Sequence, residues 1–139
     1  MARALLAVAL TGADEELLVP LNSCYVITAR DRDTALTLAA WFNCTWIRET
    51  ARATADRAAS GFARFNARVV RDLPLPPGLF AMPALRRLAA SGSRGDDVQE
   101  ELDELCSSVL ALSPSSRAAL LQASGACSPD RRRSAGRRR

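Results

Sequence analysis

Three prolines within residues 73–78 constrain the architecture of this chain more than any other feature. The segment reads Leu-Pro-Leu-Pro-Pro-Gly. A proline cannot continue a helix, because it lacks an amide hydrogen and its ring clashes with the preceding turn; it also favours an extended residue before it. We therefore expect a part made of a β-hairpin and a long helix in residues 1–78, a small helical subdomain in residues 79–123, and a tail in residues 124–139.

The N-terminal residues predict a β-hairpin. Residues 3–10 form an apolar run, and residues 24–28 are rich in strand-favouring side chains. A small, acidic turn sequence that begins with Thr11 and Gly12 lies between them. The apolar run faintly resembles the core of a signal peptide, but no small-residue cleavage site follows it, so we prefer a buried strand. An antiparallel hairpin with a long loop is expected.

Residues 34–58 predict one long helix. Its apolar side chains recur at spacings of three and four, which is typical of a helix with one buried face. Asp33 is the expected N-cap, and Gly61 follows the expected end. The residues of this stripe are Leu38, Trp41, Phe42, Thr45 and Trp46.

The pattern of the remaining chain is helical, with local start signals. Asn66 is an N-cap candidate for a helix that ends near residue 72, and further helices are expected over residues 82–90 and 97–112. Ser113 followed by proline starts a last helix. With the hairpin, these elements predict an α+β fold: an N-terminal β-hairpin, a long helix, a mostly helical C-terminal half and a disordered tail.

The absence of histidine excludes several classes of function. Histidine-based general bases, Ser-His and Cys-His pairs and most zinc sites need this side chain. The four cysteines form no C-x-x-C pair, and we interpret them as thiols of a reducing cytoplasm. We interpret the carboxylates of residues 96–104 as dipole-favoured residues at a helix start, not as a metal site. No stretch approaches the roughly 18 apolar residues of a membrane span.

Positive charge is concentrated in the tail. All 19 basic residues are arginines, and six of them lie in residues 130–139. Such a tail is usually disordered and can contact nucleic acid through counterion release. A solvated tail without a specific partner is an equally good interpretation.

Three motifs in the centre of the chain resemble a known family. They are the run Leu38-Ala-Ala-Trp-Phe-Asn-Cys-Thr-Trp46, the segment Gly61-Phe-Ala-Arg-Phe-Asn66 and the exit Leu73-Pro-Leu-Pro76. In this order they resemble the C-terminal target-recognition region of N6-adenine-specific DNA methyltransferases of single-chain restriction–modification systems. Later helical elements at residues 101–105 and 112–114 fit the same pattern, so the resemblance covers residues 3–122. Cys44 departs from it, because the family often has serine there.

The resemblance implies a bacterial, cytoplasmic, DNA-binding fragment that is not an enzyme by itself. The parent enzymes bind S-adenosylmethionine with a Gly-rich turn and hold the flipped adenine with an Asn/Asp-Pro-Pro-Tyr/Phe motif; neither occurs here. We therefore expect no catalytic residue, no metal and no cofactor in this chain. The expected partners are double-stranded DNA and a separate catalytic methyltransferase chain, with no membrane.

Six residues are candidates for DNA contact under this interpretation. Arg64 and Asn66 are the leading ones, because arginine and asparagine make bidentate contacts with guanine and adenine edges. The others would position the protein on phosphates: Arg48, Arg52, Arg57 and Arg68. The alternative for Asn66 is a helix cap, and for the arginines a salt-bridged solvent face.

A different function class stays open beside this one. The chain can also be a small, non-enzymatic protein-interaction domain with a nonspecific basic tail. The two interpretations differ in one expectation: a recognition fragment binds DNA without residues 130–139, whereas an interaction domain loses its DNA binding when these residues are removed.

Overall fold

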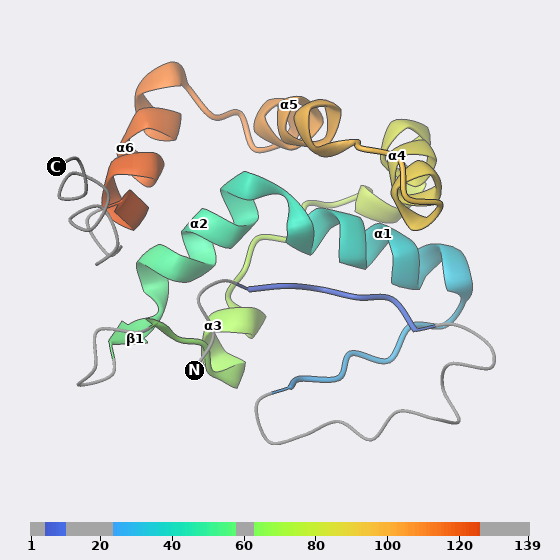
Figure 1. Cartoon of the computed structure of the whole chain (residues 1–139), viewed down its shortest axis with the longest axis horizontal. Coiled ribbons are helices and arrows are strands. Elements are labelled where there is room, and N and C mark those ends of the chain that lie inside the picture. The colour runs from blue at the N-terminus through green and yellow to red at the C-terminus, as the bar shows by residue number, and fades with distance from the viewer. Residues whose placement is uncertain (1–4, 11–23, 58–62, 126–139) are drawn as a thin grey trace, which may run out of the picture.

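The computed structural model describes residues 5–10, 24–57 and 63–125, and in these residues the chain is mostly helical (Figure 1). The strands are two residues each and pair antiparallel, with Asp56 opposite Arg64. The elements are α1 (Arg32–Asn43), α2 (Thr45–Thr54), β1 (Asp56–Arg57), β2 (Ala63–Arg64), α3 (Ala67–Arg71), the 3-10 turn η2 (Leu79–Ala81), α4 (Pro83–Ser93), α5 (Gln99–Val109) and α6 (Pro114–Gly125).

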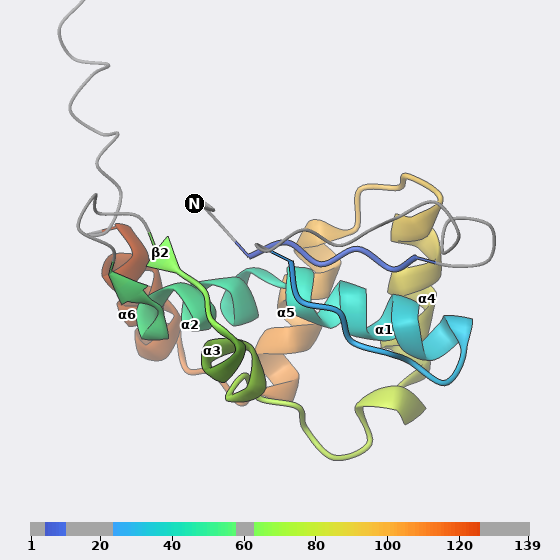
Figure 2. The same cartoon turned by 90° about the horizontal axis from the view of Figure 1, so that it is seen from below.

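The predicted α+β class with an N-terminal hairpin is wrong. Residues 5–10 and 24–29 are extended, but neither is a strand, and no backbone hydrogen bond joins them within the described residues. Both run in the same direction, toward the end of the molecule where α1 begins, so they are not two arms of a hairpin (Figures 1 and 2). An isolated strand pair is marginal in water. Each segment instead follows the helical layer.

At Ala7, the side chain of Asn43 forms the two backbone hydrogen bonds that a neighbouring strand would form in a sheet. Its Nδ2 donates to the carbonyl oxygen of Ala7 at 2.6 Å, and its Oδ1 accepts from the amide of Ala7 at 3.1 Å. Leu5 and Ala7 are half-buried against the core. The segment is therefore held by a side chain and by packing, without a sheet.

The predicted single helix over residues 34–58 is two helices that break at Cys44. The backbone of Cys44 is extended, with ψ of 136°. Asp103 of α5 accepts from the amide of Thr45 at 2.7 Å, so a carboxylate from a distant helix caps α2. Asp31, not Asp33, caps α1: its Oδ1 accepts from the amide of Thr34 at 2.7 Å.

The later helices agree with their local signals. Asn66 caps α3, and Ser113 caps α6 through a hydrogen bond that its hydroxyl accepts from the amide of Ser116 at 3.1 Å. Helix α6 continues to Gly125, so residues 124 and 125 are helical where the sequence predicts a disordered tail. The remainder of that tail, residues 126–139, lies outside the described residues.

One hydrophobic core joins the residues on both sides of the proline segment. Its fully buried side chains come from α1, α2, η2, α4 and α5, and α4 and α5 pack across α1 (Figure 1). Trp41 is at the centre, and its indole Nε1 donates to the carbonyl oxygen of Pro74 at 2.8 Å. The largest buried side chains are Trp41, Ile47, Leu79, Leu85, Thr37, Cys44 and Cys106.

Candidate nucleic-acid interface

The segment from β2 to α3 presents the leading candidate for base contact. Arg64 is exposed on β2, directly opposite Asp56 of β1. The next residue, Phe65, is half-buried against the core, and its carbonyl oxygen accepts a hydrogen bond from the Tyr25 hydroxyl at 3.4 Å. Phe65 therefore anchors the segment, while the guanidinium of Arg64 stays in solvent.

Both ends of the Asn66 side chain are engaged within the protein. Its Oδ1 accepts from the amide of Val69 at 3.0 Å, and its Nδ2 donates to Oδ2 of Asp56 at 2.7 Å. A bidentate contact with adenine would require both groups. The geometry thus fits the capping alternative for Asn66, and it joins β1 to the start of α3.

Helix α3 adds two exposed arginines beside Arg64. Arg68 lies 3.8 Å from Asp56, and because the Arg68 side chain is 70% exposed the pair adds little stability and leaves the guanidinium accessible. Arg71 follows three residues later on the same helix face and is also exposed. Arg71 is not among the residues that the sequence predicts, although its spacing from Arg68 is a usable signal.

The predicted arginines of α2 are less accessible. Arg48 and Arg52 are both half-buried, and the Nε of Arg48 is buried without a hydrogen-bond partner in the described residues. Arg57 lies in β1, but its side chain lies outside what the structure describes. The exposed arginines near β2 and α3 are therefore Arg64, Arg68 and Arg71.

Trp46 is not a free stacking platform for a base. The guanidinium of Arg117 lies 5.8 Å from the centre of its ring, which is cation–π distance, and its indole Nε1 donates to the backbone oxygen of Asp103 at 2.9 Å. These contacts join α2 to α5 and α6 and give Trp46 a structural role.

Charge separates the described chain into two regions. Residues 30–94 contain 11 arginines and five carboxylates, whereas residues 96–104 contain six carboxylates and no arginine. A single net charge for residues 1–129 hides this division into a basic and an acidic region. The helices from α1 to α4 thus form a basic region, and the start of α5 is acidic.

Comparison with known proteins finds no matching family model, no matching curated protein and no matching solved structure. Within residues 5–10, 24–57 and 63–125, histidine, cysteine and carboxylate side chains form no cluster that could bind a metal ion. In the same part of the chain, no helix combines the length and apolar character that crossing a bilayer requires.

Proposed function

We propose that this chain binds double-stranded DNA as the target-recognition part of an adenine-specific DNA methyltransferase of a restriction–modification system, without catalysing methyl transfer by itself. The observation that carries the proposal is the exposed group Arg64, Arg68 and Arg71 at the β2–α3 segment. These residues lie within or just after the Gly-aromatic-Asn motif on which the resemblance rests. Arginine is suited both to phosphates and to guanine edges.

Within this proposal the residues have different tasks. Arg64 is the base-contacting candidate, because it is exposed on a short strand held by its neighbours. Arg68 and Arg71 contact phosphates and set the register of the protein on the duplex. Asn66 acts indirectly, because its two hydrogen bonds fix the start of α3 relative to β1.

A second candidate function follows from the exposed apolar side chains of the extended segments. Leu6 is 73% exposed and Val8 is 78% exposed, and Tyr25, Val26 and Ile27 are at least half exposed. Large exposed apolar side chains that recur in neighbouring positions are typical of protein contact surfaces. This feature favours a protein-interaction domain, and it equally suits a recognition part that docks on a catalytic methyltransferase chain.

DNA binding in a chain truncated after residue 129 separates the two functions. We expect the truncated chain to bind a duplex with an affinity that falls as salt rises, because arginines release counterions from phosphates. The salt slope is the slope of the logarithm of affinity against the logarithm of salt concentration. Replacing Arg68 and Arg71 with glutamine should reduce its magnitude by about two, because each substitution removes one arginine that neutralises a phosphate. The measurement is fluorescence anisotropy of a labelled duplex over a salt series.

Arg94 provides the matched control. It is exposed and belongs to the same basic region, but it lies at the end of α4 and faces Asp96 at 3.6 Å. Arg94→Gln should leave the salt slope unchanged. If the truncated chain does not bind DNA, or if the control variant weakens binding as much as the α3 variants, the DNA-binding proposal fails and the interaction domain becomes the better interpretation.

A further inference from the structure

One exposed aromatic side chain lies beside the arginine group of β2 and α3. Within residues 5–10, 24–57 and 63–125, two aromatic side chains are exposed: Tyr25 at 50% and Phe80 at 38%. The hydroxyl of Tyr25 donates to the carbonyl oxygen of Phe65 at 3.4 Å. Phe65 directly follows Arg64, and Figure 1 shows the start of the extended segment of residues 24–29 next to α3. A ligand that contacts Arg64 therefore meets the ring of Tyr25 as well.

The arginines beside Tyr25 are available to such a ligand. Arg64 and Arg71 are exposed, and neither has a hydrogen bond or an ion pair within the described residues. Arg68 pairs with Asp56 at 3.8 Å, but its side chain stays 70% exposed. An aromatic ring among unpaired cations is complementary to a polyanion that also has flat aromatic faces. Nucleic acid has both properties, because every base has a face on which an aromatic side chain can stack.

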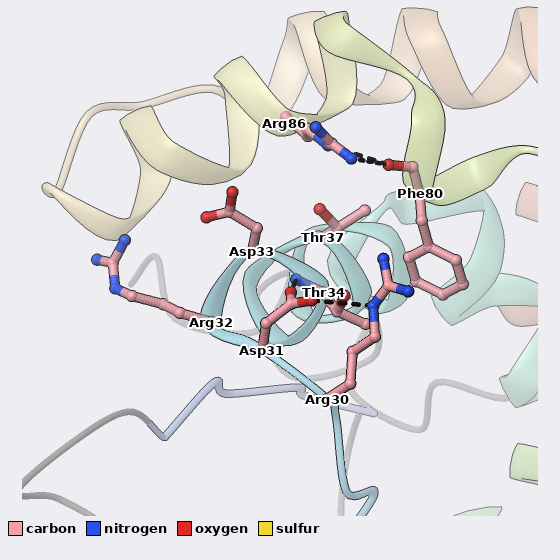
Figure 3. A pocket seen from close by; sticks show the side chains of 8 residues that line it. All are labelled: Arg30, Asp31, Arg32, Asp33, Thr34, Thr37, Phe80 and Arg86. Carbon is pink, nitrogen blue, oxygen red and sulfur yellow. Dashed lines mark hydrogen bonds and ion pairs between the residues drawn. The ribbon is translucent and has the colours of Figure 1, made fainter.

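The other exposed aromatic side chain has neighbours that are already engaged. Phe80 lies at a pocket of about 220 Å³ where α1 begins, and α4 contributes Arg86 to this pocket (Figure 3). Arg86 donates from Nε and Nη2 to the carbonyl oxygen of Phe80, at 3.0 and 2.6 Å, and Arg30 pairs with Asp31 at 2.9 Å. Asp33 adds a second carboxylate to the lining. Two of the three arginines here are engaged, and the carboxylates oppose an anion, so Phe80 serves as a matched comparison for Tyr25.

A fully paired duplex gives a protein side chain little access to the faces of its bases, because each base is stacked between its neighbours. Enzymes that modify a base extrude it from the stack, and the bases around it then lose a stacking neighbour. We propose that Tyr25 stacks on a base left exposed in this way when the target adenine is extruded, while Arg64 holds the adjacent DNA. This inference rests on the proposed function. It makes Tyr25 a positioning residue, which stabilises the opened duplex and takes no part in methyl transfer.

Fluorescence anisotropy of the full-length chain with two labelled duplexes tests the inference. Both duplexes have the same mixed sequence, but in one of them a central adenine faces an abasic site and is unpaired. The wild-type chain should bind the abasic duplex more tightly, because less free energy is needed to expose a base there. Tyr25→Ala should reduce this preference by about tenfold, as expected for the loss of one stacking contact. The same variant should bind the intact duplex nearly as well as the wild-type chain, which a variant that has lost its fold would not do.

Tyr25→Phe separates the ring from its hydroxyl. It keeps the stacking surface and loses only the hydrogen bond to Phe65, so the preference for the abasic duplex should persist. Phe80→Ala is the matched control and should leave the preference unchanged. If Tyr25→Phe loses the preference as Tyr25→Ala does, the tyrosine acts through Phe65 and the inference is overturned. It is also overturned if Tyr25→Ala keeps the preference.

The two duplexes also separate this inference from the function on which it rests. If the wild-type chain binds neither duplex, the DNA-binding proposal itself fails, and the stacking of Tyr25 fails with it. If the wild-type chain binds both duplexes equally, DNA binding stands and only the stacking of Tyr25 is contradicted.

Discussion

The centre of the molecule and its N-terminal extended segments are both apolar in sequence, but their surroundings are opposite. Trp41 and Ile47 are fully buried, whereas Leu6 is 73% exposed and Val8 is 78% exposed. The first pair lies on helices that face other helices across a core, and the second lies in a segment covered on one side only. An apolar side chain is buried when a second element covers it, and hydrophobicity alone does not supply that element.

The largest expected effect is at Trp41, which is the buried residue of this comparison. Trp41→Ala removes a fully buried ring and leaves the carbonyl of Pro74 without its donor. We expect a loss of about 3–5 kcal/mol in the free energy of unfolding, which approaches the whole stability of a small domain. Urea unfolding followed by circular dichroism measures it.

Val8→Ala is the comparison for Trp41→Ala. It removes apolar atoms from an exposed position and should change the free energy of unfolding by no more than about 0.5 kcal/mol. Equal losses for the two variants would show that Val8 is buried in solution, and the contrast between the two regions would not hold.

Two cysteines allow the same comparison between a buried and an exposed side chain, measured as the dependence of stability on pH. Cys106 is fully buried beside Cys44, whereas Cys24 lies exposed in the second extended segment. The hydrogen bond with the Cys44 thiol and burial raise the pKa of Cys106 above its ordinary value of 9.0. The folded chain then keeps a proton that the unfolded chain releases, so the stabilising effect is complete below pH 9 and is lost as pH rises further.

At pH 10 this difference amounts to at most about 1.4 kcal/mol for one thiol, the value reached when the folded thiol keeps its proton completely. Cys106→Ala should therefore have a lower stability at pH 7 but a flatter decline between pH 8 and pH 10, measured by urea unfolding across that range. Cys24→Ala should leave the decline as it is. An unchanged decline in Cys106→Ala would mean that the Cys106 thiol ionises in the folded chain.

The sequence predicts those parts of the fold whose signals are local. Asn66 and Ser113 are caps within three residues of the amides they bind, and α3 and α6 begin where these residues indicate. The prediction of one long helix is wrong because the break depends on Asp103, which lies 58 residues from the amide it caps. The hairpin prediction is wrong because an apolar run and strand-favouring side chains indicate that a segment is extended, but do not show which element pairs with it.

The candidate site residues also divide into those whose signals are local in sequence and those that depend on distant contacts. Arg64 is a candidate that the sequence supplies by itself, because it lies in a recognisable motif and the structure adds only that it is exposed. The cap that Asn66 forms on α3 is local in sequence, but the second hydrogen bond of its side chain, from Nδ2 to Asp56 ten residues away, could not be predicted. The pocket at the start of α1 cannot be predicted, because Thr37 and Arg86 come to line it only after α1 and α4 have packed together.

The smallest expected change in stability comes from placing charges on the exposed side chains of residues 5–10, which are the exposed half of the comparison. Leu6→Lys and Val8→Lys together should alter the free energy of unfolding by no more than about 0.5 kcal/mol, because both side chains already face solvent. We also expect the exposed apolar side chains to cause self-association at high concentration, and the same double variant should reduce it, since lysines on an extended edge oppose pairing with another chain. Sedimentation velocity over a concentration series, with urea unfolding of the same samples, measures both quantities.

Leu5→Lys is the matched control, because Leu5 is half-buried against the core and its charge should destabilise the fold. If the double variant is as unstable as Leu5→Lys, the outward side chains are covered within the folded chain; if it stays stable and still self-associates, the contact between copies lies elsewhere.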